Sequence, residues 1–287
     1  MIKKLSTLVS ILSVICTMSF SQNHSNISLA EWSLHRAIQT GKMVNMDFPR
    51  IARTQFGIGA IEYVSVLFET KTSVEDSLYL QKLKAECTKY NVASNLIMID
   101  HEGNLGDTSL VKRNEAVENH YKWVKAAHFL GCHSIRVNAA GEGSPEEVKK
   151  AVIDGLTKLC EYASKYNINV IVENHWGNSS NPDWLVPVIR AVNKSNCGLL
   201  PDFGNFDKEA DRYRAVEQMM PFAKGVSAKS YDFDEKGFET KIDYTKMLDI
   251  VRKAGYTGYI GIEYEGERLA EEDGIKATIK LINTYSK

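Results

Sequence analysis

Residues 169–176 read Asn-Val-Ile-Val-Glu-Asn-His-Trp, so that an apolar run leads directly into polar side chains. A short β-branched run of this kind indicates a buried strand whose carboxyl end is marked by the polar residues. Residues 198–205, GLLPDFGN, and residues 259–266, YIGIEYEG, repeat the pattern and reach Asp202 and Glu263. The three segments predict buried strands that each end at a carboxylate.

Longer amphipathic segments separate eight apolar runs along the chain. The expected strands cover residues 27–34, 60–66, 93–99, 134–138, 169–173, 198–201, 225–228 and 259–264. Residues 144–147, Ser-Pro-Glu-Glu, predict a helix start with an N-cap serine, a proline at the first helical position and a capping-box glutamate. A last helix is expected over residues 269–284. Eight strand–helix units predict the α/β class and a single (β/α)8 TIM barrel.

The amino terminus has the features of an export signal. Lys3 and Lys4 precede a mostly apolar run over residues 5–20 that is interrupted by Ser6, Ser10 and Ser13. This run is shorter and more polar than the roughly 20 apolar residues of a membrane span. We therefore predict a signal peptide over residues 1–21, a TIM barrel domain over residues 22–287, and an exported, periplasmic protein without membrane insertion after cleavage.

Composition excludes some classes of partner. The chain has 35 basic and 36 acidic residues, and no basic stripe interleaved with aromatic residues, so no nucleic-acid partner is expected. The cysteines that remain after cleavage match no zinc pattern and are expected to be buried thiols; they are Cys87, Cys132, Cys160 and Cys197.

The three strand-end carboxylates predict a metal site. In TIM barrels the active site lies at the carboxyl ends of the strands, where Glu173, Asp202 and Glu263 would converge. Carboxylates this close repel one another unless a cation compensates them. Oxygen ligands suit Mn²⁺, Mg²⁺ and related hard ions, and the expected cofactor is a divalent Mn, Mg, Co or Zn ion whose identity stays open.

Side chains two residues apart on a strand share a face. This alternation predicts neutral and cationic residues beside the carboxylates. His175 is thus expected beside Glu173, and Lys229 beside Ser227. The candidate substrate-binding residues are His175, Lys229, Asn205, Arg136, Asn138 and Trp176.

Several motifs resemble one known family. They are Glu173-Asn174-His175, Asp202-Phe203-Gly204-Asn205, residues 227–232 (SAKSYD) and residues 261–266 (GIEYEG). Over the mature chain the sequence resembles the xylose isomerase-like TIM barrel superfamily, the sugar phosphate isomerases/epimerases. The resemblance implies that Glu173, Asp202 and Glu263 bind the metal and that the two glutamates also handle protons. One departure stands out: Ser227 occupies the position at which the family often supplies a histidine ligand.

These residues support a leading hypothesis and two alternatives. The leading one is a metal-dependent sugar isomerase or epimerase, in which Glu173 and Glu263 transfer protons next to a carbonyl. The first alternative is a keto-sugar or keto-glycoside lyase or hydratase that uses the same enolate, and the second is a non-catalytic carbohydrate-binding barrel. Each takes a small-molecule sugar as partner, and the chain is compatible with a homo-oligomer.

Structural roles compete with these interpretations. Glu173 could pair with a lysine at the rim, and Arg136 could brace the barrel interior by pairing with a carboxylate. Among Trp32, Trp176 and Tyr231, packing competes with stacking on a sugar, and Trp176 lies nearest the expected site. Glu62 and His101 also end expected strands and are secondary candidates.

Overall fold

The structure is a computed structural model that describes residues 26–70, 72–207 and 210–285. The predicted signal peptide over residues 1–21 lies outside these ranges. Among the helices in them, none is long and apolar enough to span a bilayer.

Eight parallel strands form one curled sheet in the order β6-β5-β4-β3-β2-β1-β8-β7. The strands are β1 (Ile27–Ala30), β2 (Ala60–Val64), β3 (Ala93–Met98), β4 (Ser134–Val137), β5 (Asn169–Glu173), β6 (Cys197–Leu200), β7 (Val226–Ser230) and β8 (Ile260–Tyr264). Between β6 and β7, isolated parallel bridges pair Leu199 with Ala223 and Asp202 with Ser227. The sheet confirms the predicted (β/α)8 TIM barrel.

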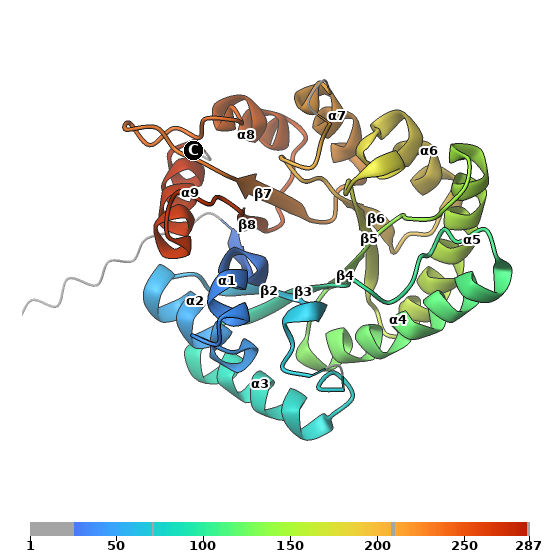
Figure 1. Ribbon diagram of the computed structural model, residues 1–287, viewed down its shortest axis with the longest axis horizontal. Helices are drawn as coiled ribbons and strands as arrows, with labels where there is room; N and C mark the ends of the chain where they lie inside the picture. Colours follow the sequence, from blue (N-terminus) through green and yellow to red (C-terminus); the bar gives the residue numbers. More distant parts are fainter. Residues whose placement is uncertain (1–25, 71, 208–209, 286–287) are drawn as a thin grey trace, which may run out of the picture.

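Helices follow the strands and form a ring outside them (Figure 1). They are α1 (His35–Gln39), α2 (Phe48–Phe56), α3 (Ser77–Tyr90), α4 (Leu110–Leu130), α5 (Pro145–Ser164), α6 (Pro182–Val192), α7 (Arg212–Met219), α8 (Tyr244–Lys253) and α9 (Glu271–Tyr285). Short 3-10 turns are η1 (Glu31–Leu34), η2 (Asn45–Asp47), η3 (Ser65–Leu67), η4 (Gly177–Ser180) and η5 (Met220–Phe222). The predicted capping box is present at the start of α5, where Ser144 and Glu147 cap each other's backbone.

The two faces of the sheet bury different sets of apolar side chains. Outward-facing residues such as Ile135 and Val137 join the large core between strands and helices. A smaller cluster fills the barrel interior and consists of Ala30, Val64, Leu67, Leu96, Met98, Ile171 and Leu200. Because side chains alternate along a strand, the residues two positions after Ile171 and Leu200 point into the mouth of the barrel. These residues are Glu173 and Asp202.

The first strand was predicted over residues 27–34, but it is shorter in the structure. β1 ends at Ala30, and η1 follows it. Hydrogen bonds to Glu31 hold this turn: its carboxylate accepts from Asn45 Nδ2 at 2.7 Å and from the Val64 amide at 3.1 Å. Burial raises the pKa of Glu31 to about 8. The turn is therefore fixed by partners distant in sequence.

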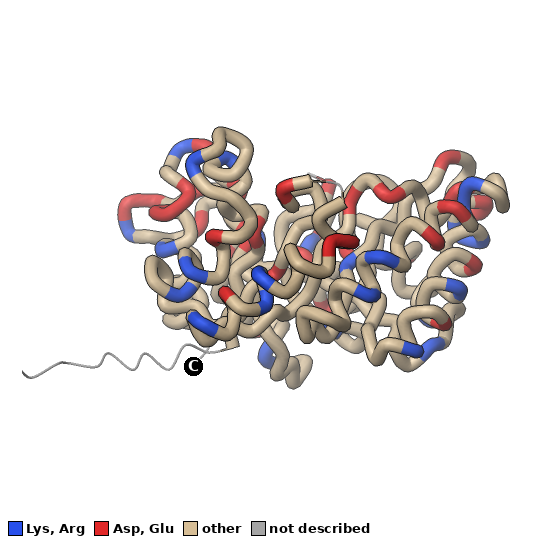
Figure 2. Tube along the Cα trace, turned by 90° about the horizontal axis from the view of Figure 1, so that it is seen from below, with Lys and Arg blue, Asp and Glu red and all other residues tan. Residues whose placement is uncertain are grey.

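Surface charge is mixed. Lys and Arg are interspersed with Asp and Glu over the outer helices (Figure 2), in keeping with the net charge of −1. The four cysteines of the described ranges are buried and unpaired, as predicted.

Candidate metal and active site

Three buried carboxylates meet at the mouth of the barrel. Glu173 is the last residue of β5, Asp202 follows β6 by two residues, and Glu263 lies in β8. Each is at most 4% exposed, and each offers one oxygen that lies within 4.8 Å of the other two. In TIM barrels the functional side chains gather at the carboxyl ends of the strands. This strand-end rule applies here to side chains that are up to 90 residues apart in the sequence.

Backbone amides fix the orientation of Asp202. Its Oδ1 accepts hydrogen bonds from the amides of Gly204 and Asn205, both at 2.8 Å. The Asp202 amide in turn donates to Asn174 Oδ1 at 2.7 Å, so the end of β5 is tied to the end of β6. Asp202 Oδ2 has no hydrogen-bond partner within the described ranges and points into the cluster.

Asn205 connects two charged groups of the site. Its Nδ2 donates to Glu173 Oε1 at 2.9 Å, and its Oδ1 accepts from Lys229 Nζ at 3.0 Å. The preceding Gly204 allows the chain to pass this close, since a Cβ there would lie 2.9 Å from the Lys229 side chain.

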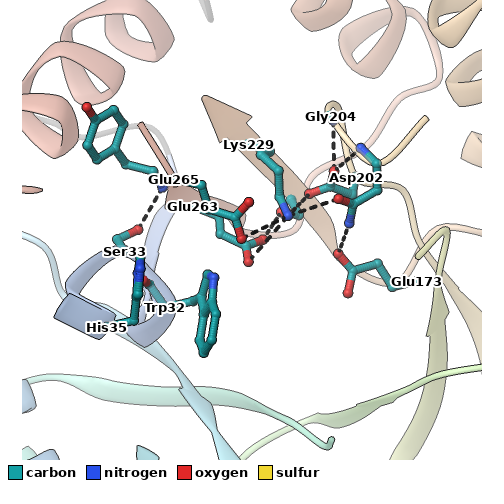
Figure 3. Close-up of polar contacts among 12 residues, drawn as sticks. Trp32, Ser33, His35, Glu173, Asp202, Gly204, Lys229, Glu263 and Glu265 are labelled. Atoms are coloured by element: carbon teal, nitrogen blue, oxygen red, sulfur yellow. Dashed lines mark hydrogen bonds and ion pairs between the residues drawn. The ribbon is translucent and has the colours of Figure 1, made fainter. Parts of the chain in front are cut away.

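Lys229 provides a buried positive charge among the carboxylates (Figure 3). Its Nζ lies 3.3 Å from Glu265, 3.7 Å from Glu263 and 4.0 Å from Asp202. Burial alone would lower the pKa of Lys229, but the surrounding carboxylates, Asp202 first among them, raise it well above its usual value. Lys229 is therefore an ammonium ion that stabilises negative charge.

Arg136 reaches the same cluster from β4. Its Nε lies 2.8 Å from Glu173 Oε2, an ion pair without hydrogen-bond geometry. Its Nη1 donates to Asp100 Oδ1 at 2.8 Å, and Asp100 also accepts from Asn138 Nδ2 at 2.8 Å. The interpretation of Arg136 as a brace that pairs with a carboxylate is thus confirmed, and the brace extends to a second carboxylate. Burial raises the pKa of Glu173 well above its usual value, although Arg136 opposes this.

Ser227 stands where the family resemblance implies a histidine. Its Oγ donates to Glu263 Oε2 at 2.8 Å, so the serine orients a carboxylate instead of offering a nitrogen ligand.

Burial raises the pKa of Asp202 to about 6, while Lys229 opposes the rise.

The arrangement fits a divalent cation. Glu173 Oε2 and Asp202 Oδ2 are buried carboxylate oxygens without hydrogen-bond partners in the described part of the chain. Oxygens that share one ion are at most about 4.2 Å apart for Mg²⁺ or Zn²⁺ and about 5.2 Å apart for Ca²⁺, so oxygens within 4.8 Å of one another would need only a small side-chain shift to bind the smaller ions. The residues that would hold it are Glu173, Asp202 and Glu263, and their hard oxygen donors suit the expected ions.

The remaining predicted site residues lie beside the cluster. His175, Asn138 and Trp176 line a cavity of about 690 Å³ at the ends of β3, β4 and β5, together with the secondary candidate His101. Glu62, the other secondary candidate, lies deeper in the barrel, where its Oε1 accepts from Ser28 and Asn95.

Sequence reasoning missed two residues of the site. Asp100 comes directly after the expected third strand, so the strand-end rule could have found it, but His101 was chosen instead. Asn174 is the second of these residues. An amide directly after the end of a buried strand indicates a hydrogen-bonding role. Trp32, one of the three aromatic candidates, stacks on His35 with ring centroids 4.8 Å apart and packs against the interior cluster.

Fold and site together define a (β/α)8 barrel with a cluster of three acidic residues at its mouth. Within this class, the chain belongs to the xylose isomerase-like TIM barrel family, which matches residues 52–285.

Individual relatives are distant. Inosose isomerase of Bacillus subtilis (strain 168) is 24% identical over 165 residues, 49% of this chain, and the chain spans only 58% of that relative's length. A D-tagatose 3-epimerase-like protein is 18% identical with a TM-score of 0.72, over 91% of this chain and 96% of the other. The IOLI protein, solved with a bound zinc atom, is 17% identical with a TM-score of 0.69, over 91% and 99%. The two structural likenesses support the fold.

Proposed function

We propose that this protein is a metal-dependent isomerase or epimerase that transfers a proton next to the carbonyl of a sugar. The observation that carries the proposal is the convergence of Glu173, Asp202 and Glu263 within 4.8 Å of one another. The isomerase and epimerase names among the relatives support the same reaction class.

A divalent ion bound by the three carboxylates would polarise the sugar carbonyl and an adjacent hydroxyl. Glu173 and Glu263 reach the centre from β5 and β8 and would flank the reacting carbon, one removing a proton and the other returning one. The two glutamates approach from different strands, so a proton can be returned to the opposite face or to the neighbouring carbon. The first outcome is epimerisation, and the second is isomerisation.

Neighbouring side chains prepare the two glutamates and stabilise charge. Asn205 holds Glu173 at 2.9 Å, and Ser227 holds Glu263 at 2.8 Å. The Lys229 ammonium is fixed among the carboxylates and can stabilise an enediolate oxygen as its charge develops. Because burial keeps water away from these groups, their electrostatic interactions are stronger than they would be in solution.

The proton-transfer step can be tested without knowledge of the product. The protein, loaded separately with Mn²⁺, Mg²⁺, Co²⁺ and Zn²⁺, is incubated in D₂O with a panel of free ketoses and keto-glycosides. NMR should detect deuterium at the carbon next to the carbonyl of at least one of them. Glu173→Gln and Glu263→Gln should each slow the exchange by about 10²–10⁴-fold. Absence of exchange with every metal, or full exchange in both variants, would overturn the proposal.

A lyase acting through the same enolate is the second candidate. The cavity beside the cluster supports it, because that space can receive a leaving group on the β-carbon. Release of the aglycone from a 3-keto-glycoside, without an epimerised product, would favour the lyase over the isomerase.

We also propose that the protein acts in the periplasm after removal of residues 1–21. Unphosphorylated sugars would then be its substrates, since phosphorylated sugars are expected inside cells. Mass spectrometry of the protein isolated from its native cells should find a chain that begins at Gln22. A mature protein that retains Met1 would contradict export by this route.

A further inference from the structure

A cavity lies next to the carboxylate cluster but is not lined by it. It has a volume of about 690 Å³ at the carboxyl ends of β3, β4 and β5, within the roughly 300–1,000 Å³ usual for small-molecule sites. Asn138 and His175 line it, whereas Glu173, Asp202 and Glu263 do not. The cavity is therefore space additional to the reaction centre.

The cavity and the cluster are joined by one short chain of contacts. Asn138 and Asp100 form part of the cavity wall, and both contact Arg136. Arg136 Nε lies 2.8 Å from Glu173 Oε2. A ligand that filled both spaces would be longer than a single reacting sugar ring, and its two parts would be only one arginine side chain apart.

Trp176 provides an aromatic wall at this cavity. Its side chain is 68% exposed, although it follows β5 by only three residues. Its φ of 61° lies in a region that large side chains rarely adopt. The indole contacts the ring of His175 edge-on, with centroids 5.8 Å apart, but most of its surface stays exposed. The face of an indole is, however, a good surface for the C–H groups of a sugar ring.

The polar groups of the cavity suit uncharged hydroxyls. His175 lines the cavity, and its ring nitrogens can form hydrogen bonds with hydroxyl groups. Asn138 adds an amide, and His101, whose φ is 64°, also lines the cavity. The Glu102 carboxylate is already paired with Lys122 at 2.9 Å. No lysine or arginine is among the described residues that line the cavity, so the lining offers hydrogen bonds to hydroxyls and no such cation to a phosphate.

We propose that this cavity is a second subsite that binds the neighbouring, uncharged ring of a glycoside, with Trp176 stacking on that ring. The reacting ring would lie over the carboxylate cluster, so the substrate class is a two-ring sugar and not a free monosaccharide. This inference rests on the proposed function, because it places the reacting ring at that same centre.

Binding measurements test the subsite separately from the reaction. Calorimetry on the metal-loaded protein would compare D-glucose with cellobiose, maltose, lactose and trehalose. At least one disaccharide should bind about tenfold or more tightly than glucose. Trp176→Ala should remove about tenfold of that preference, and Trp176→Phe should retain most of it. Phe238→Ala, which removes another exposed aromatic ring on the β7–α8 connection, should leave the preference unchanged.

Two results would overturn the subsite. One is equal affinity of the wild-type protein for glucose and all four disaccharides. The other is a Trp176→Ala variant that weakens glucose and the disaccharides by the same factor. The deuterium-exchange experiment separates this proposal from the proposed function: a disaccharide preference without deuterium exchange by the wild type supports the subsite and refutes the reaction.

Discussion

The mouth of the barrel has two unlike sides. Over β5 to β8, Glu173, Asp202 and Glu263 are buried, and hydrogen bonds or ion pairs hold each in place. Over β3 to β5, the groups border an open cavity, and Trp176 is largely exposed. Arg136 is the link, because it contacts Glu173 on the first side and Asp100 on the second.

In the proposed mechanism, this difference separates the groups that react from the groups that recognise the ligand. Charged groups that must act on a reacting atom are effective when neighbours hold them in a fixed, dry geometry. Groups that only recognise a ligand can be hydrated until the ligand arrives. If this division is right, changes on the acidic side should have large effects on stability and ion binding, and changes beside the cavity should have smaller ones.

The largest expected effect on stability comes from the link itself. Arg136→Met leaves Glu173 buried without its guanidinium partner, and we expect a loss of about 3–5 kcal/mol in the free energy of unfolding at pH 8. Urea titration of metal-free protein would measure it. Arg50→Met is the matched control, because Arg50 pairs with Asp47 while 42% exposed and should cost about 1 kcal/mol or less. Equal losses in the two variants would contradict the distinction.

A buried acid without a cation offers the second test. Burial raises the pKa of Glu62 from 4.5 to about 7, while hydrogen bonds from Ser28 and Asn95 oppose the rise. A folded-state pKa above the unfolded value contributes stability below pH 4.5 that is lost as the pH rises through 7, on the order of 3 kcal/mol.

Glu62→Gln keeps the side chain neutral at every pH. Relative to the wild type, the variant should therefore gain up to about 3 kcal/mol of unfolding free energy between pH 5 and pH 8. Urea titration at both pH values would measure the gain. A difference between the two proteins that does not change with pH would show that Glu62 is not held neutral by burial.

Ion binding gives the third test. Asp202→Asn retains the oxygen that accepts from Gly204 and Asn205 but replaces the free oxygen with an amide. We expect metal affinity to fall by about a hundredfold or more, measured by calorimetry with Mn²⁺ or Zn²⁺. Asp100→Asn serves as the control, since Asp100 lies near the site but outside the cluster of carboxylates. Similar losses in both variants would place the ion elsewhere.

The smallest effect is expected from Asp100 itself. Burial would raise its pKa, but Arg136 and Asn138 hold the pKa of Asp100 below its usual value. A lowered pKa contributes stability above about pH 4 that is lost as the pH falls through the folded value. Asp100→Asn should thus cost about 1 kcal/mol at pH 7, since the side chain is partly exposed, and this cost should shrink as the pH falls and the wild-type carboxylate becomes protonated. A cost that persists at low pH would indicate a packing role.

The convergence of the three carboxylates could largely be predicted from the sequence. The period of two within each strand and the strand-end rule were sufficient to place Glu173, Asp202 and Glu263 together, since both depend on local patterns. The capping box at Ser144 was predictable for the same reason. Such features depend only on residues that are close together in the sequence.

The arrangement of the residues around the cavity was much harder to predict. His101 and Trp176 have positive φ angles in the connections that follow β3 and β5, a conformation that few residues other than glycine adopt. The pairing of Arg136 with both Asp100 and Glu173 depends on three strands meeting in space. Loop paths and long-range pairs of this kind are decided by tertiary packing and not by local propensity.

The join between β6 and β7 has a consequence for how this enzyme family can diversify. The Ser227 amide donates to the Pro201 carbonyl at 2.9 Å, and the Phe203 amide donates to the Ser227 carbonyl at 3.1 Å. Both contacts use main-chain atoms, so they do not depend on the hydroxyl group of Ser227. If the proposed ion binds here, exchange of a histidine for a serine would change the chemistry offered to it while these two main-chain contacts remain available, so new reactions could arise at this position without a new scaffold.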